Sequence, residues 1–231
     1  MSSEKFIIGR GTKVHVALLP PGSNTEIVPQ TITSSALAAA AATSLSVEAI
    51  TEALTASSAY PIFLSFADAV DGTDKPAKVV ANAADSATSL TVATLVKAIN
   101  DGSTAEYPVK LHARTGVDIN PNANDTTTQT FDDDGYETGV VTRLGYGVSC
   151  PGNFLSMDAG FKTCFYAFNE FKNNIWLRIE LPAPDGYTTG YVFKGSARVT
   201  NMPLNVPAGE IVTCNIEFKF NGKPTIVDPS V

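Results

Sequence analysis

The chain has 231 residues, with 16 Lys plus Arg against 23 Asp plus Glu, and a formal net charge of −7. Charged residues make up 17% of the chain and hydrophobic residues 44%, whereas about 25% is a usual charged fraction. This composition excludes an intrinsically disordered chain, and the acidic balance excludes a nucleic-acid binder that works through bulk positive charge.

Two strands are predicted before residue 34. In residues 13–19, Val14, Val16 and Leu18 alternate with other positions, which is the pattern of a half-buried strand. Residues 26–32 form the second predicted strand. No secretory signal precedes them, and the longest apolar run, residues 36–42, is too short to cross a bilayer.

Residues 34–114 contain a tandem repeat. Ala42–Val47 is echoed by Ala87–Val92, and we match Tyr60–Leu64 with Tyr107–Leu111 after a short insertion. Each unit is predicted to hold a short strand, a turn or short helix, and a strand opened by Tyr-Pro, where the missing proline donor is tolerated. We expect an inserted module whose halves pack on each other.

The remaining chain is predicted to form one helix and several strands. Residues 115–134 are rich in Asn, Asp and Thr and are predicted to be a long loop, followed by a strand over residues 138–149. The predicted helix spans residues 156–171, can be capped by Ser156 or Asp158, and has an apolar face of Phe161, Cys164, Phe165 and Phe168. Strands follow at 175–181, 187–200 and 210–220.

The predicted fold is therefore mainly β. It is a sandwich or barrel with one flanking α-helix, plus an inserted β-rich module that carries the tandem repeat. Residues 1–33 and 115–231 would form the core, and residues 34–114 the insert. Three cysteines, Cys150, Cys164 and Cys214, lack metal-ligand spacing and are expected to be reduced, buried thiols in a protein made in the cytoplasm.

No metal site is predicted. The acidic run Asp132–Gly135 lacks the glutamate that an EF-hand loop needs at its twelfth position. The earlier set of Asp118, Asn120 and Asn122 lacks the required glycine. A solvated polar segment is the preferred interpretation of both.

No catalytic or cofactor site is predicted either. His15 and His112 lie in predicted strands, and Ser149 and Ser196 lack the flanking glycines of a nucleophile elbow. Gly9–Gly11 precedes a strand instead of following one, so it is not a dinucleotide-binding motif. We predict that the protein is not an enzyme. A hydrolase with dispersed carboxylates stays open as an alternative, although no pair is nominated.

Several motifs in the second half stand in a distinctive order. Gly195–Thr200 reads Gly-x-Ala-x-Val-Thr, the alternating strand at 210–220 follows a loop, and Gly222–Thr225 reads Gly-x-Pro-Thr. In this order they resemble the end of tail tube, or major tail, proteins of long-tailed bacteriophages. The helix, the strand at 175–181 and the Gly-x-Gly-Thr-x-Val sequence at residues 9–14 also fit. The resemblance covers roughly residues 9–32 and 115–227, without the repeat insert.

The resemblance implies a structural virion protein. Such proteins form six-membered rings that stack into a hollow tail tube, through which DNA passes into the host without specific binding. The implied partners are further copies of the chain and tape measure, tail terminator and baseplate or tail-tip proteins, with no membrane. The implied location is the virion tail, after assembly in the host cytoplasm.

This hypothesis suggests positions for several surfaces. Residues 115–134 and the N-terminal segment would contact neighbouring rings, and the insert would project outward. Glu217 and Lys219 would face the channel or a neighbour. An acidic channel surface would repel phosphates and let DNA slide.

The alternative function is a virion surface or adhesive carbohydrate-binding β-sandwich. Tyr136, Tyr146 and Tyr187 lie near glycine-containing turns and would be its candidate glycan-contacting residues. This alternative predicts a monomer or small oligomer with measurable glycan affinity, whereas the tail tube hypothesis predicts rings.

Overall fold

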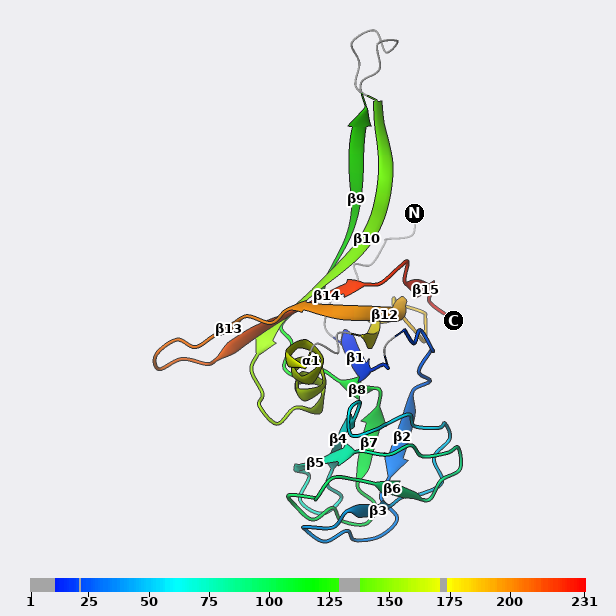
Figure 1. Ribbon diagram of the computed structural model, residues 1–231, viewed down its shortest axis with the longest axis vertical. Coiled ribbons are helices and arrows are strands. Elements are labelled where there is room, and N and C mark those ends of the chain that lie inside the picture. The colour runs from blue at the N-terminus through cyan, green and yellow to red at the C-terminus, as the bar shows by residue number, and fades with distance from the viewer. Residues whose placement is uncertain (1–10, 21, 129–137, 171–173) are drawn as a thin grey trace.

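The computed structural model describes residues 11–20, 22–128, 138–170 and 174–231, and for residues 123–128 and 138–144 it describes the backbone alone. The protein is mainly β, with several antiparallel sheets and one short helix, as predicted. Figure 1 shows a central body, a lobe below it, a long hairpin projecting upward and a shorter arm projecting to the left.

The central body is built on a nine-stranded antiparallel sheet. Its main path runs β8 (Val109–Lys110), β1 (Lys13–Leu18), β11 (Ile175–Glu180), β12 (Val192–Asn201), β14 (Thr213–Phe220), β10 (Thr138–Asn153) and β9 (Asp118–Thr128). In addition, β13 (Leu204–Asn205) pairs with β14, and β15 (Thr225–Val227) pairs with β12. Strands from both sides of the repeat therefore share one sheet.

One face of this sheet forms the core of the body. Val14 of β1 lies opposite Ile179 of β11, and Ala197 of β12 lies opposite Phe220 of β14, all of them buried. The single helix, α1 (Ala159–Asn169), packs against β1, β8 and β12. The alternation predicted for residues 210–220 is confirmed by the burial pattern of β14.

The helix is shorter than the predicted range of 156–171, and its predicted apolar face is confirmed for Phe161 and Cys164, which are buried, and in part for Phe168, which packs against the core. Asp158, one of the two predicted caps, accepts a hydrogen bond from the Phe161 backbone N–H at 2.8 Å. Phe165 is 47% exposed, so its predicted place in the core is wrong. The buried face is made of Ala159, Gly160, Phe161, Thr163, Cys164 and Ala167. Mostly small side chains bring the helix close to the sheet, which turns Phe165 outward.

Gly160 marks the closest approach of this helix. A Cβ atom at this position would lie 2.6 Å from the Lys110 carbonyl oxygen and 3.0 Å from Leu111 Cα. We expect Gly160→Ala to lower the free energy of unfolding by about 1–2 kcal/mol, because the clash outweighs the higher helix propensity of alanine. Urea denaturation measures this, with Gly222→Ala as the control because no atom lies within 4 Å of its added Cβ.

The lobe contains the predicted repeat. Its four-stranded sheet has the order β2 (Gln30–Thr33), β7 (Thr104–Tyr107), β4 (Ile62–Ala67) and β5 (Asp74–Val79). A separate ladder pairs β3 (Ser44–Ser46) with β6 (Ser89–Thr91), the two short strands of the repeat. The prediction that the halves pack on each other is therefore confirmed.

The two halves are related by a constant spacing. Ser44 and Ser89, which are 45 residues apart, join their hydroxyls at 3.0 Å. Two backbone hydrogen bonds, both 3.0 Å long, show the same spacing. The Val47 N–H donates to the Thr88 carbonyl, and the Val92 N–H, 45 residues later, donates to the Thr43 carbonyl. Equivalent apolar positions are buried in both halves: Leu45 and Leu90, Val47 and Val92, Ile50 and Leu95, Leu54 and Ile99. The lobe is thus an internal pseudo-dimer.

The predicted match between the two Tyr-Pro sequences is wrong. The sheet order places β7 beside β2 and β4 beside β5, so β4 and β7 are the counterparts in the pseudo-dimer. Tyr60-Pro61 precedes β4, whereas Tyr107-Pro108 follows β7 and precedes β8. Both prolines do stand just before a strand, as predicted. Their agreement reflects a shared local requirement at a strand start.

Two strands pair across the predicted boundaries at residues 33 and 114. β2 belongs to the first predicted core segment but pairs with β7 in the lobe. β8 lies within residues 34–114 but pairs with β1 in the body. The division into 1–33, 34–114 and 115–231 stays a prediction. These pairings fasten the lobe to the body at both of its ends.

The loop predicted for residues 115–134 is wrong over much of its length. Asp118–Thr128 forms β9, an edge strand that pairs with β10 from Asp118↔Ser149 to Thr128↔Thr138, with an irregularity near Val141. The two strands make the long hairpin in Figure 1. Polar residues can form such a strand because the partner strand satisfies the backbone hydrogen-bonding groups.

Acid should weaken the lobe through Asp68. Its carboxylate accepts hydrogen bonds from Asn100 Nδ2 and from the backbone N–H groups of Val70 and Asp71, and the Asn100 bond chiefly lowers its pKa. An unfolded aspartate has a pKa of about 3.9, so this stabilisation is present above that pH and is lost as the pH falls below it. Asp68→Asn should therefore reduce the decline in stability between pH 6 and pH 3, measured by urea denaturation. An unchanged decline would contradict it.

Candidate assembly surfaces

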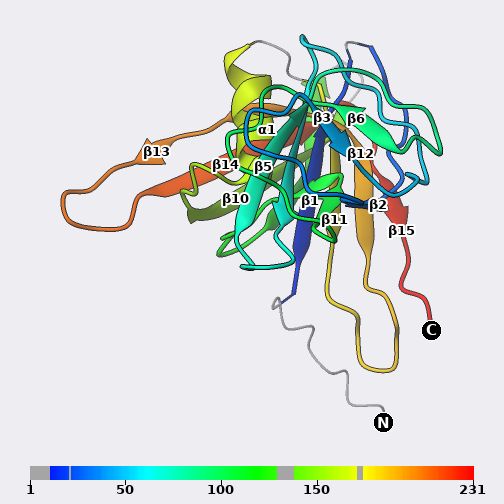
Figure 2. The same cartoon turned by 90° about the horizontal axis from the view of Figure 1, so that it is seen from below.

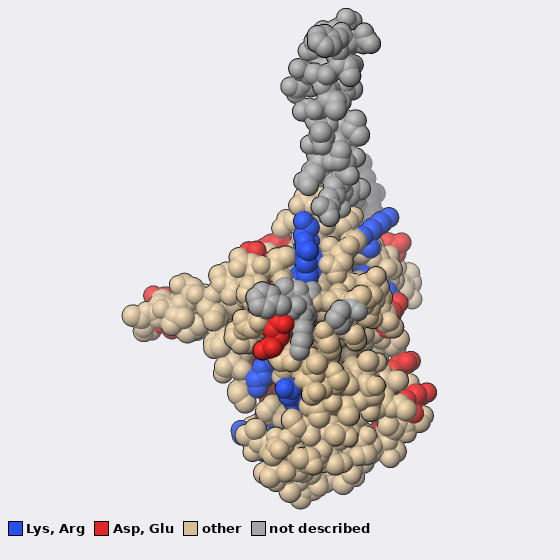
Figure 3. Space-filling model, in the orientation of Figure 1, with Lys and Arg blue, Asp and Glu red and all other residues tan. Residues whose placement is uncertain are grey.

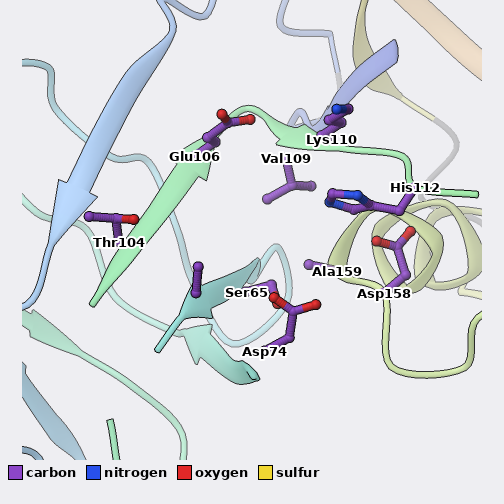
Figure 4. Close-up of a pocket in the computed structure, with 10 residues that line it drawn as sticks. Ser65, Asp74, Thr104, Glu106, Val109, Lys110, His112, Asp158 and Ala159 are labelled. Atoms are coloured by element: carbon purple, nitrogen blue, oxygen red, sulfur yellow. The ribbon is translucent and has the colours of Figure 1, made fainter. Parts of the chain in front are cut away.

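The two histidines lie near carboxylates but form no catalytic arrangement. His15 Nε2 is 3.8 Å from Glu106 Oε2, and burial lowers the pKa of His15. His112 and Asp158 line a pocket of about 230 Å³ between the lobe and the helix, and Figure 4 shows their side chains close together. Burial raises the pKa of Asp158, while its carboxylate is already engaged in capping α1. The pocket therefore lies between the lobe and the helix, and its Asp158 carboxylate serves as a helix cap.

The two serines tested for nucleophilic chemistry have structural roles. Ser149 Oγ donates to Asn215 Oδ1 at 3.0 Å, which links β10 to β14. Ser196 Oγ donates to Asn174 Oδ1 at 2.7 Å. Neither hydroxyl is hydrogen-bonded to a histidine.

The metal and thiol candidates are distributed as follows. Asp118, Asn120 and Asn122 lie at alternate positions of β9, and Asp132–Gly135 lies outside the described residues. Within the described ranges, no group of three or more His, Cys, Asp or Glu could hold a metal ion, and no helix is long and apolar enough to span a membrane.

The three cysteines are free and buried, and burial raises the pKa of each thiol.

Of the tyrosines considered for glycan binding, Tyr146 is partly buried against the core and Tyr187 is 45% exposed. Tyr136 lies outside the described residues. Because the ring of Tyr146 packs on the core, it is not free to stack on a sugar.

Arg114, which sequence reasoning did not single out, fixes the end of the β10–β14 ladder. Its guanidinium donates to the carbonyl oxygens of Cys150 at 3.2 Å, Cys214 at 3.1 Å and Asn153 at 2.6 Å, and its Nε donates to the backbone carbonyl oxygen of His112 at 3.0 Å. One side chain therefore ties the segment leaving the lobe to two central strands. The shorter arm begins next to this point, because its Leu204 pairs with Cys214.

The face of the large sheet that points away from the buried core, the polar face, is biased toward basic residues. Arg178 of β11 lies directly opposite Lys194 of β12, and Arg198 of β12 lies opposite Lys219 of β14. Arg178 and Lys194 have carboxylate partners, Glu180 and Glu26. Arg198 and Lys219 make no ion pair in the part of the chain that the structure describes. Directly opposed like charges are destabilising.

Charge is distributed unevenly over the view in Figure 3. Lys and Arg side chains gather over the central part, whereas the front of the lobe is almost free of charged residues. The Ala/Thr/Ser-rich repeat thus accounts for part of the low charged fraction of the chain.

The arm, residues 202–212, exposes apolar side chains. Leu204 is 47% exposed, Val206 70% and Ile211 68%, and Glu210 is the only charged residue among them. Figures 1 and 2 both show the arm standing clear of the body. Three large apolar side chains within such a short projection indicate a contact surface for another molecule. Residues 202–209 were predicted to be a loop and residues 210–212 the start of a strand, although apolar residues in a Pro- and Gly-containing stretch are a usable signal.

An apolar groove, the helix–lobe groove, runs between α1 and the lobe and has a volume of about 310 Å³. Phe63 and Leu64 of β4 and Ala77 of β5 line one side, and Met157 lies at the helix end. Val96, also in the lining, is 77% exposed. Two basic residues, Lys78 and Lys162, complete the lining.

No protein-family model matches the sequence, and no curated protein matches it. Several solved chains are similar in structure, among them the following three. One, from the virion of a native gene transfer agent particle, has a TM-score of 0.41 at 11% identity, over 50% of this chain and 85% of its own. A second chain comes from the tail of an empty gene transfer agent particle, refined with C6 symmetry. It has a TM-score of 0.39 at 12% identity, over 50% of this chain and 82% of its own. A third chain comes from a six-fold symmetrised anti-feeding prophage baseplate. It has a TM-score of 0.39 at 7% identity, over 52% of this chain and 83% of its own.

Proposed function

We propose that this protein is a structural component of a phage-like tail and, more specifically, a tail tube subunit that assembles into stacked six-membered rings. The observation that carries the proposal is the arm, whose Leu204, Val206 and Ile211 are exposed in the free subunit. Burying such residues requires a partner. The long β9–β10 hairpin is a second projection of the same kind (Figure 1).

The sequence resemblance supports the same function. The motifs that carry it coincide with continuous elements: residues 195–200 lie in β12, residues 213–220 form β14, and residues 225–227 form β15. These strands are neighbours in the large sheet. The proposed partners are further copies of the chain, with tape measure, tail terminator and baseplate or tail-tip proteins at the ends. The role is structural, without catalysis.

The polar face of the large sheet is the proposed channel surface. The opposite face is buried and packs against α1, so it is not available to DNA. With Arg178, Lys194, Arg198 and Lys219 beside Glu180 and Glu217, DNA would meet mixed charge there, in place of the acidic surface expected from composition. The hairpin would contact the next ring and the lobe would project outward.

Electron microscopy of the purified full chain over a concentration series tests the function. Rings or hollow tubes with six-fold end views are the expected result. A monodisperse monomer at the highest concentration, with no assembly after addition of tail components, contradicts the proposal. Tubes of another symmetry would contradict the hexamer alone.

A further inference from the structure

We infer that the arm of one copy docks in the helix–lobe groove of a second copy. This inference rests on the proposed self-assembly and names the two surfaces that carry one of its contacts. The arm supplies Leu204, Val206 and Ile211, all exposed. The groove supplies an apolar lining that includes Phe63 and Val96.

The two surfaces match in polarity. Burial of exposed apolar side chains is favourable at about 25 cal/mol per Å² of apolar surface removed from water. In the groove lining, Met157 is 54% and Val96 77% exposed, so apolar side chains of the groove are accessible from outside. The arm and the groove are each apolar surfaces that the free subunit leaves in water.

The two surfaces also match in charge. Glu210 is exposed on the arm and forms no ion pair among the described residues. Lys78 Nζ lies 5.6 Å from the centres of the Phe63 and Tyr166 rings, and Lys162 Nζ lies 3.7 Å from Met157 Sδ. Neither lysine pairs with a carboxylate in the described part of the chain. The arm therefore carries one unpaired acidic residue, and the groove carries two lysines without a carboxylate partner, so the two surfaces have complementary charge.

The occupant must come from a second molecule. Both views show the arm extended away from the body, so it does not cover the groove of its own chain (Figures 1 and 2). A second copy supplies the apolar tip and the acidic residue together, on one segment. An unrelated tail protein with an acidic apolar segment is the competing occupant, which the experiment below distinguishes.

Cross-linking between two differently tagged copies tests the contact. One full-length copy carries Val206→Cys and the other Val96→Cys, and a short bismaleimide joins them. The native thiols are buried, so they should not react. We expect cross-linked dimer at a yield about tenfold above that of the matched control, Val206→Cys with Val70→Cys, because docking raises the effective concentration of the two thiols. Val70 is as exposed as Val96 but lies in the β4–β5 turn.

A charge exchange provides the second measurement. Glu210→Lys alone and Lys162→Glu alone should each reduce the Val206–Val96 cross-link several-fold, and the two substitutions together should restore it. Equal cross-linking to position 70, or no rescue by the exchange, would overturn the inference. An absence of cross-link in the pure protein also overturns it and points to the competing occupant.

The outcomes separate this inference from the proposed function. Tubes without the Val206–Val96 cross-link would leave the function standing and overturn the arm–groove contact. A specific cross-link without rings or tubes would support the contact and contradict the tail tube proposal. Failure of both measurements would overturn both.

Discussion

Replacing Arg114 with methionine is expected to lower the free energy of unfolding by about 2–4 kcal/mol, since hydrogen bonds to a charged group contribute about 1.5–3 kcal/mol each and the sites are partly open to water. Methionine keeps the apolar length of the side chain but removes every donor. The carbonyl oxygens of Cys150, Cys214 and Asn153 then lose their bonds to the guanidinium.

Space around Arg114 offers no alternative arrangement. A Cβ atom at Gly152 would lie 2.3 Å from the Ala113 carbonyl oxygen and 2.9 Å from Arg114 Cζ. The backbone segments are therefore too close for a repacked side chain to take over. Lysine should recover less than half of the loss, because one ammonium group cannot reach carbonyls on three sides as a planar guanidinium does.

Urea denaturation at neutral pH measures this effect. Arg198→Met is the matched control, because Arg198 is exposed and makes no described ion pair, and its effect should stay within about 0.5 kcal/mol. An equal effect of both substitutions would show that Arg114 acts only through general charge. Full recovery by Arg114→Lys would contradict the multidentate role.

The parts of the fold that the sequence predicted are those with a local periodic pattern. The alternation from Thr213 to Phe220 predicted β14 with the correct buried face, because one side of that strand packs on the core. The echo of Ala42–Val47 in Ala87–Val92 predicted the pairing of β3 with β6, because the same apolar positions must be buried in both halves.

The parts that were missed depend on partners far away in the chain. β9 is mostly polar beyond Ile119, which packs against the core, and its pairing with β10 is what makes it a strand. The face of α1 was set by the close approach of Gly160 to Lys110 and Leu111, which no helical pattern contains. The contacts of Arg114 were equally hidden, because they are to backbone carbonyls whose positions follow from the sheet.

The candidate assembly surfaces were also only partly predictable from the sequence. Sequence reasoning tested His15, His112 and the acidic runs because catalytic and metal chemistry requires particular side chains. Assembly requires only exposed apolar surface. The sequence feature that indicates it is the presence of Leu204, Val206 and Ile211 in a segment where a loop would usually be polar. The groove was not predictable, because it forms between β4, β5 and α1 after folding.

The largest effect on assembly is expected from changing the arm. In the triple variant Leu204→Ser, Val206→Ser and Ile211→Ser, rings and tubes should be lost at concentrations where the wild-type chain assembles, because the arm no longer has apolar surface to bury. Fully burying a side chain of this kind contributes about 1.5–3 kcal/mol, so the loss of three weakens each contact by several orders of magnitude at most.

The same triple variant should fold normally. All three side chains are exposed in the free subunit, so the free energy of unfolding should change by about 0.5 kcal/mol or less per substitution. Sedimentation velocity and electron microscopy measure assembly, and urea denaturation measures the fold. The matched control is Leu37→Ser with Val70→Ser, which removes exposed apolar side chains from the lobe.

This comparison separates a specific contact from general hydrophobicity. Leu37 and Val70 are 65% and 79% exposed, so their loss lowers surface hydrophobicity by a similar amount to the loss of two arm residues. If assembly depends on the arm alone, the lobe variant assembles like the wild type and the arm variant stays monomeric. If both variants lose assembly equally, exposed apolar surface in general drives association, and the arm has no special role. If the arm variant assembles at wild-type concentrations, the observation that carries the proposed function is removed.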